Sequence, residues 1–380
     1  MHVYLDWNAT APPLASVIEA MADAAREAWG NPSSVHAHGR AARARVEAAR
    51  AAVAELAECD ARDVVFTSGG TEANNLALRS AFATEKGTLL TSRLEHPSIL
   101  RVAEALAREG AVTLRLVAVR ADGRIDLEEL ARALGEVEGR ALVALQAVNP
   151  ETGVIQPIDE AISLARARAG TLVHVDAIQA FGRVASLATL ADSRSLAAHK
   201  IRGPKGIGAL VTRPGVRVSP VLLGGAQERG LRPGTVDPIA AAGLAIAAAH
   251  ARTAPARYAA LASVRDAIER ALLAAHPGAL VNGGGAPRAP HVTNVSFPGW
   301  RGAELVAALD LEGVSVSSGS ACSAGTIEPS SVVTAMLGDA RAASAVRISL
   351  GEDTTVADVD RATGAFLRVL ARTPIAPAQK

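Results

Sequence analysis

Two segments decide the fold: VHVDAIQAFG at residues 173–182 and AAHKIRGPKGIG at residues 197–208. The first is an apolar run of strand length that ends at Asp176, and Gln179 follows three residues later. The second ends a short apolar run in the pair His199-Lys200 and continues into glycine-rich sequence. Such runs, bounded by polar residues and glycine, predict buried strands with Asp176 and Lys200 at their ends.

Similar strand-length runs recur on either side of these segments and alternate with amphipathic helical patterns. Strands are predicted at 64–67, 88–91, 112–117, 141–148, 172–176, 195–198 and 207–212, with helices at 71–82, 97–109, 127–134 and 158–169 between several of them. This alternation predicts an α/β fold, with a mostly parallel sheet and helices on both faces. Ligands of such sheets bind beyond the carboxyl ends of the strands.

The pattern changes after Pro238. Helices are predicted at about 239–251 and 257–275, followed by a strand at 291–297, a helix at 303–312, a strand at 346–350 and a helix at 355–371. This order predicts a smaller α+β domain. We therefore expect a large domain at 14–254, and a small domain formed by 1–13 and 255–380.

Composition excludes several classes of protein. Of the 380 residues, 49% are hydrophobic and 20% are charged, which is typical of a packed globular chain. The net charge is +1 and only 3% of residues are aromatic, so we expect no nucleic-acid partner. The longest apolar run, 239–249, is too short to span a membrane. The first residues lack a signal-peptide pattern, which favours a cytoplasmic protein. The two cysteines and the absence of CxxC or HExxH spacing predict no metal site.

Asp176 and Lys200 together predict a pyridoxal phosphate (PLP) site. In such a site a lysine holds the aldehyde as a Schiff base, and an acid keeps the pyridine nitrogen protonated so that the ring accepts electrons. A buried aspartate is costly unless a cation pairs with it, and the pyridinium nitrogen is such a cation. Alone, an aspartate in the place of Asp176 is more often a structural strand terminator, and a lysine is usually solvated.

The segment FTSGGTEANN at 66–75 resembles an anion cradle. Gly69 and Gly70 allow close backbone approach, and a helix beginning near Thr71 offers free N–H groups to a phosphate. An ordinary helix N-cap explains the same residues. For His199, contact with a phosphate and burial in the core are both possible.

Four further residues stand out, each with an ordinary alternative. His96 follows a strand, Asn149 could cap a turn, and Arg347 on a strand could pair with a carboxylate of the protein or of a substrate. Cys322 lies in SVSSGSACSAG at 315–325, where small residues predict a mobile loop over about 320–328. An exposed thiol is a liability unless it is used, so an electron-sink cofactor with a mobile thiol suggests sulfur chemistry. Cys59 is expected in a small packing niche.

Taken together, these segments resemble the cysteine desulfurases of the NifS/IscS-like type, within the class V aminotransferase family. The resemblance runs over the whole chain, and its motifs occur in the family's order: LDWNATAPP, GNPSSVHAHGRAAR, FTSGGTEANN, SRLEH, NPETGVIQPI, HVDAIQAFG, AAHKIRGPKGIG, ERGLRPGT, SSGSAC and RISLG. It implies the PLP-dependent transferase fold of type I and a homodimer with shared sites. The SSGSAC motif resembles that of the group with a long, mobile cysteine loop.

The resemblance also assigns roles to residues of this chain. It implies PLP on Lys200, His96 stacked on the ring, and Asp176 and Gln179 at the ring nitrogen and the phenolic oxygen. It further implies phosphate contacts from Gly70, Thr71, His199 and, in the neighbouring subunit, Thr235; carboxylate contacts from Asn149 and Arg347, with Asn149 also near the cofactor; and sulfur on Cys322.

The activity implied is conversion of L-cysteine to L-alanine with a persulfide on Cys322, supplying iron–sulfur clusters or other thio-cofactors through an acceptor protein such as a cluster scaffold. Alternatives are a selenocysteine lyase or a class V aminotransferase and, from another class, a non-catalytic sulfur-relay partner. Two departures from the family bear on this. Ala197 replaces a serine, so one phosphate hydrogen bond is expected to be missing. The chain ends soon after its last helix, so scaffold docking through a longer tail is not expected.

Overall fold

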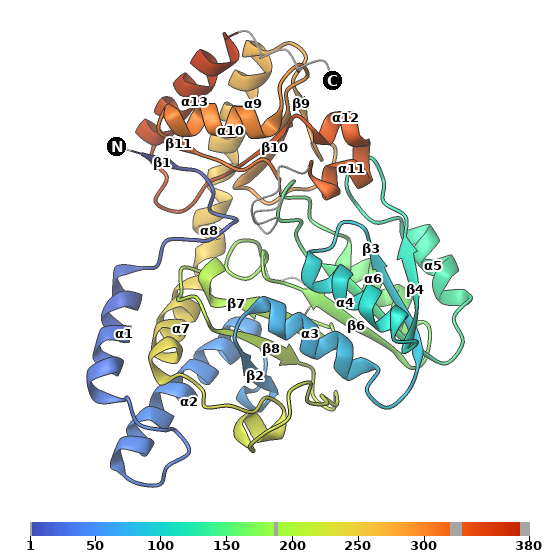
Figure 1. The fold of residues 1–380 in the computed structure, drawn as a ribbon, viewed down its shortest axis with the longest axis vertical. Helices are drawn as coiled ribbons and strands as arrows, with labels where there is room; N and C mark the ends of the chain where they lie inside the picture. Colours follow the sequence, from blue (N-terminus) through green and yellow to red (C-terminus); the bar gives the residue numbers. More distant parts are fainter. Residues whose placement is uncertain (1, 186–188, 320–328, 373–380) are drawn as a thin grey trace.

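The computed structural model describes residues 2–185, 189–319 and 329–372. Figure 1 shows a large sheet with its helices below a smaller sheet with helices of its own. The large sheet has the strand order β2-β8-β7-β6-β5-β3-β4. The strands are β2 (Val64–Thr67), β3 (Gly87–Ser92), β4 (Val112–Val117), β5 (Arg140–Gln146), β6 (Thr171–Asp176), β7 (Ser193–Ala197) and β8 (Gly208–Thr212). Strand β8 pairs antiparallel with both neighbours, and the remaining pairings are parallel.

Helices cover both faces of this sheet because successive strand residues point to opposite sides. On one face, α3 (Gly70–Ala81) and α4 (Pro97–Arg108) pack on residues such as Leu89 and Leu142. On the other face, α5 (Leu127–Gly135) and α6 (Ile158–Arg166) pack on Val143 and its neighbours. Beside them, α1 (Ala15–Glu27), α2 (Ala37–Ala57) and α7 (Pro238–Ala251) cover the β2-β8-β7 end of the sheet. These layers confirm the predicted α/β fold with a mostly parallel sheet.

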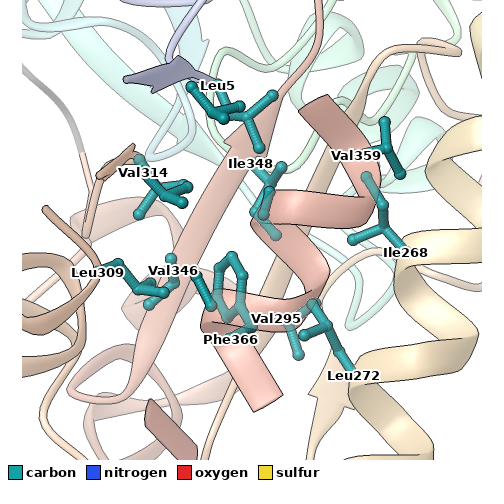
Figure 2. Packing of buried hydrophobic residues seen from close by; sticks show 14 of the residues in the cluster. Leu5, Ile268, Leu272, Val295, Leu309, Val314, Val346, Ile348, Val359 and Phe366 are labelled. Carbon is teal, nitrogen blue, oxygen red and sulfur yellow. The ribbon is translucent and has the colours of Figure 1, made fainter. Parts of the chain in front are cut away.

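The smaller sheet is antiparallel, with the order β12-β10-β9. Its strands are β9 (Leu280–Val281), β10 (Val292–Ser296) and β12 (Ala345–Ser349). Around it lie α8 (Ala254–Ala259), α9 (Leu261–Ala275), α10 (Gly302–Leu311), α11 (Ser331–Leu337), α12 (Asp339–Ala342) and α13 (Val356–Leu370). Figure 2 shows its core, where Phe366 of α13 lies among aliphatic side chains from the sheet and from α9.

The N-terminal segment joins the two parts. Strand β1 (Val3–Tyr4) pairs parallel with β11 (Val314–Ser315) beside the small sheet. The chain then passes the turn that carries Lys200: the Ala11 N–H donates to His199 O at 3.0 Å, and the Leu14 N–H donates to Arg202 O at 3.2 Å. The domain division expected at 13/14 and 254/255 stays a prediction, and its second boundary falls at the start of α8.

Most predicted elements lie within a few residues of the observed ones. The helix predicted at 257–275 is wrong as a single helix, because the chain breaks it into α8 and α9 around Ala260. The short strands β1, β9 and β11 were not predicted, since two residues carry no periodic pattern. In the described ranges, no helix combines the length and the apolar character that crossing a membrane requires.

Candidate active site

A cavity of about 260 Å³ opens at the carboxyl ends of β5, β6 and β7. Its lining includes most of the predicted site residues, namely Gly70, Thr71, His96, Asp176, Gln179, His199, Lys200 and Arg347. Asn8, Ala9, Gln146, Val148, Pro150, Ile178 and Ala197 complete it. The fold therefore brings together residues that are far apart in the sequence, in the place where parallel sheets bind ligands.

Asp176 ends β6 and is 6% exposed. Its Oδ2 accepts a hydrogen bond from Asn74 Nδ2 at 2.8 Å, and its Oδ1 accepts from the Ile178 N–H at 3.1 Å. Within the described part of the chain, no cation forms an ion pair with this carboxylate. A buried carboxylate that faces a cavity without such a partner suits a cationic ligand atom.

A buried chain of polar groups leads to Asp176. Asn74 on α3 donates through Nδ2, so its Oδ1, 3.0 Å from His174 Nε2, must accept from that ring. His174 Nδ1 then accepts from Ser193 Oγ at 2.8 Å. Burial lowers the pKa of His174 to about 4, so the ring is neutral at pH 7. The hydrogen bonds from Ser193 through His174 and Asn74 therefore run in one direction, and Asp176 is their final acceptor.

Lys200 ends a 3₁₀ turn, Ala198–Lys200, directly after β7. Its Nζ donates to Asn8 O at 2.6 Å and to Ala9 O at 2.7 Å. Both carbonyls belong to the N-terminal segment, which thus fixes the lysine head against the cavity wall. Asn8 was not singled out in the sequence, because nothing local links it to a lysine 192 positions away.

The turn between β2 and α3 forms one end of the cavity. Gly69 has φ +152°, a conformation that favours glycine, and is the N-cap of α3. A Cβ on Gly208 would lie 2.7 Å from Gly69 Cα, so a glycine there lets β8 approach the turn closely. Gly70 and Thr71 are the first helical residues and line the cavity, where the first N–H groups of a helix attract anions.

Two histidines line the cavity in different ways. His96 is the N-cap of α4, and its Nδ1 accepts from the Ser98 N–H at 3.1 Å, with Pro97 in the first helical turn. His199 lies 3.1 Å from Thr10 Oγ1 through its Nδ1. Burial, and next the charge of Lys200, lower the pKa of His199 to about 4, so this ring is also neutral at pH 7.

Arg347 on β12 closes the side of the cavity next to the small sheet. It is 2% exposed, and its Nη2 pairs with Asp6 Oδ1 at 2.5 Å. Its Nη1 donates to Pro150 O at 3.2 Å, while Nε is buried with no partner in the described part. The carboxylate that pairs with Arg347 in this structure therefore belongs to the protein, which was one of the two possibilities left open by the sequence.

Two predicted site residues do not line the cavity, and a third lies outside the described residues. Asn149 Oδ1 accepts from the Glu151 and Thr152 N–H groups, each at 2.9 Å, so its amide caps the turn that follows β5. Thr235 is exposed and lies outside the cavity lining. Cys322 and the rest of the predicted mobile segment, 320–328, lie outside the described residues.

The second cysteine lies in a different place. Cys59 is half-buried and lines a separate, more open hollow of about 670 Å³ beside Arg194. Burial raises the pKa of its thiol to about 11, so at neutral pH the sulfur is protonated and a poor nucleophile. This placement suits the packing role expected for Cys59.

The sequence pattern of the aminotransferase class-V family matches residues 3–362. The chain belongs to this family. A protein of Cereibacter sphaeroides named cysteine desulfurase is 42% identical over 366 residues, which cover 94% of this chain and 93% of that protein. Both findings confirm the resemblance seen in the sequence.

Solved structures of similar proteins agree with the class-V assignment. One described as a NifS-like protein superposes with a TM-score of 0.89 at 33% identity, covering 98% of this chain and 100% of that one. Another, described as SspA in complex with cysteine, has a TM-score of 0.78 at 30% identity and covers 93% and 99%. The predicted PLP-dependent transferase fold is confirmed by these likenesses.

Proposed function

We propose that this class-V protein is a cysteine desulfurase, which converts L-cysteine to L-alanine and passes the sulfur to Cys322. The observation that carries the proposal is the cavity in which Lys200, Asp176 and Arg347 converge at the carboxyl edge of the sheet. The relatives named cysteine desulfurase support the same activity.

The residues present fit pyridoxal phosphate. Asp176 offers a buried carboxylate that lacks a cation in the described part of the chain, which suits the pyridinium nitrogen. Gly70 and Thr71 open α3 toward the cavity, with His199 also on its wall, and these groups suit the phosphate. When bound, the cofactor supplies an electron sink for carbanion chemistry.

The protein's own residues have separate tasks in this proposal. Lys200 holds the cofactor aldehyde and afterwards moves the substrate Cα proton, which requires its neutral amine. His96, which lines the cavity, would stack on the ring of a bound cofactor and take the thiol proton. Arg347 holds the substrate carboxylate, and Asn149 would join it only by turning its amide away from the turn that it caps. Because Asp6 already pairs with Arg347 at 2.5 Å, the substrate must share that guanidinium or displace Asp6.

Cys322 takes the sulfur. Its thiolate attacks the substrate sulfur, so that an S–S bond forms while the C–S bond breaks. The electron pair of the C–S bond remains on carbon, which gains a proton to become the methyl group of alanine. The balance is cysteine plus enzyme thiol giving alanine plus enzyme persulfide, and no outside oxidant is needed.

We propose that the enzyme acts as a homodimer, in which Thr235 reaches the phosphate in the neighbouring subunit. Large apolar side chains support an interface near that residue and on the segment joining α1 to α2. Leu223 is 91% exposed and Trp29 is 63% exposed. The proposed acceptor is a protein such as an iron–sulfur scaffold, and a reducing, cytoplasmic setting fits the thiol chemistry.

The test is to incubate purified protein with L-cysteine and a thiol reductant, which releases the persulfide sulfur as sulfide, and to measure alanine and sulfide. Wild type should form both, and Cys322→Ala should lose sulfur transfer while still binding PLP. Cys59→Ala is the matched control and should remain active, because its protonated thiol takes no part. Unchanged sulfide release by Cys322→Ala would instead indicate a lyase of the selenocysteine type. Formation of 3-mercaptopyruvate, with the amino group transferred to a keto acid, would indicate an aminotransferase.

A further inference from the structure

A second buried arginine lies behind the cavity without lining it. Arg183 is 1% exposed, and its guanidinium reaches four acceptors from three segments of the chain. Its Nη1 donates to Asn8 Oδ1 at 2.8 Å and also to Gln179 Oε1. Its Nη2 donates to Lys200 O at 2.9 Å and to Trp7 O at 3.2 Å. One guanidinium therefore joins the N-terminal segment to the turns that carry Gln179 and Lys200.

Among the described residues, the positive charge of Arg183 has no close negative partner. In the described ranges, no carboxylate forms an ion pair with it. Tyr258 contacts it, and Glu352 and Arg347 act on it at longer range with opposite sign. Two histidines that the charge of Arg183 also acts on, His291 and His199, are neutral because burial lowers the pKa of each. Burying such a cation is unfavourable unless negative charge compensates for it elsewhere.

Arg183 fixes the direction of the hydrogen bonds around it, because a guanidinium can only donate. The oxygen of the Gln179 amide must therefore face Arg183, which turns Nε2 toward the cavity side, where it donates to Asn8 O at 3.1 Å. An amide nitrogen carries two hydrogens, so the bond to Asn8 O leaves one that can serve an acceptor in the cavity, which Gln179 lines. Asn8 is oriented in the same way, with Oδ1 on Arg183 and Nδ2 donating to Pro150 O at 2.9 Å.

We propose that Arg183 is a positioning residue that holds Gln179 as a hydrogen-bond donor to the ring oxygen of the cofactor. The proposal rests on the cofactor assignment made above. With Arg183 in place, the amide cannot flip to present its oxygen, and the guanidinium charge behind it favours an ionised, negatively charged ring oxygen. That anionic oxygen would be the compensating charge that the buried arginine lacks among the residues that the structure describes.

Loss of Arg183 has two expected effects. Cofactor affinity falls about tenfold or more, the size expected for a hydrogen bond to a charged group. The pH midpoint of the visible absorbance of the bound cofactor rises, because a nearby cation disfavours protonation and its removal relieves that effect. A role in fold stability alone would leave this midpoint unchanged.

The experiment measures PLP affinity of the apoprotein and the pH midpoint of the absorbance in wild type, Arg183→Met, Gln179→Ala and the double variant. Arg194→Met is the matched control, since Arg194 is 5% exposed, donates to Ala57 O and makes no contact with Gln179. If Arg183→Met does not fold, Arg183→Lys replaces it in both backgrounds.

The double variant decides the outcome. If Arg183 acts through Gln179, its replacement weakens PLP binding in wild type but adds little in the Gln179→Ala background, while Arg194→Met changes neither quantity. The proposal would be overturned if Arg183→Met weakened PLP binding by the same factor in both backgrounds, or if the pH midpoint did not move. The cofactor assignment would remain intact in either case. Failure of the wild-type protein to bind PLP would instead overturn the proposed function.

Discussion

The core of the small sheet and the floor of the candidate cavity are equally buried but are held together differently. In the core around the small sheet, Phe366 of α13, Leu309 of α10 and Val346 of β12 pack as apolar side chains that no partner has to orient (Figure 2). Around the cavity, Asp176 and Arg183 are buried too, yet each depends on hydrogen bonds from other segments. Apolar packing tolerates small shifts, whereas a directed polar chain has one correct arrangement. The effects of substitutions in the two regions should therefore differ. Replacing a residue around the cavity should mainly reduce activity, and replacing a residue in the small-sheet core should mainly reduce stability.

The largest expected effect is on chemistry. Lys200→Ala should abolish stable attachment of PLP after borohydride reduction and lower alanine formation by roughly 10²–10⁴-fold or more, because both the covalent hold and the proton carrier are lost. Lys205→Ala, on the exposed side of the same turn, is the control and should behave like wild type. A borohydride-stable adduct in Lys200→Ala would show that another lysine holds the cofactor.

The next effect is on stability, and it belongs to the small sheet. Phe366 is 1% exposed and stacks on Phe297 with ring centroids 6.3 Å apart. Phe366→Ala should lower the free energy of unfolding by about 3–5 kcal/mol, and Phe366→Leu should lower it less. The folded fraction should bind PLP as wild type does. Weakened binding at temperatures where the variant is folded would show that the two regions are coupled.

The sequence predicts the strands and the residues at their ends well, but it predicts the contacts between distant segments poorly. The strands of the large sheet and the pair Asp176 and Lys200 follow from local signals, an apolar run that ends in a polar residue. The residues that orient them do not. Asn74 lies 102 positions from Asp176 and Asn8 lies 192 positions from Lys200, so these contacts depend on packing between distant segments. Asn149 is a site residue expected from the sequence whose amide the structure uses locally. Its oxygen accepts from the turn that follows β5 and so is not directed to a ligand in the cavity.

The pH dependence of stability should also separate the two regions. Glu95 is buried beside the cavity and accepts from Ser92 Oγ at 2.8 Å. Burial raises its pKa to about 8, so the folded protein keeps this carboxyl protonated while the unfolded chain ionises it from about pH 4.5 upward. Its stabilising contribution is complete below pH 4.5 and is lost as the pH rises to 8, at up to about 1.4 kcal/mol per pH unit. Glu95→Gln should remove this decline in denaturant titrations. An unchanged slope would mean that another group causes it.

His174 should produce the smaller effect, with the opposite sign. Its folded pKa of about 4 lies below the usual 6.5, because the ring is fully buried between Asn74 and Ser193. Between pH 6.5 and pH 4, the imidazole is protonated in the unfolded chain and neutral in the folded protein. Stability is therefore lost as the pH falls from 6.5 to 4. The total is about 3 kcal/mol, from 1.36 kcal/mol per pKa unit. His174→Gln, which retains one donor and one acceptor, should flatten the acid side of the stability profile while Phe366→Leu leaves the profile's shape unchanged. The same acid slope in His174→Gln and wild type would show that the chain of donors ending at Asp176 is not what makes the cavity floor sensitive to acid.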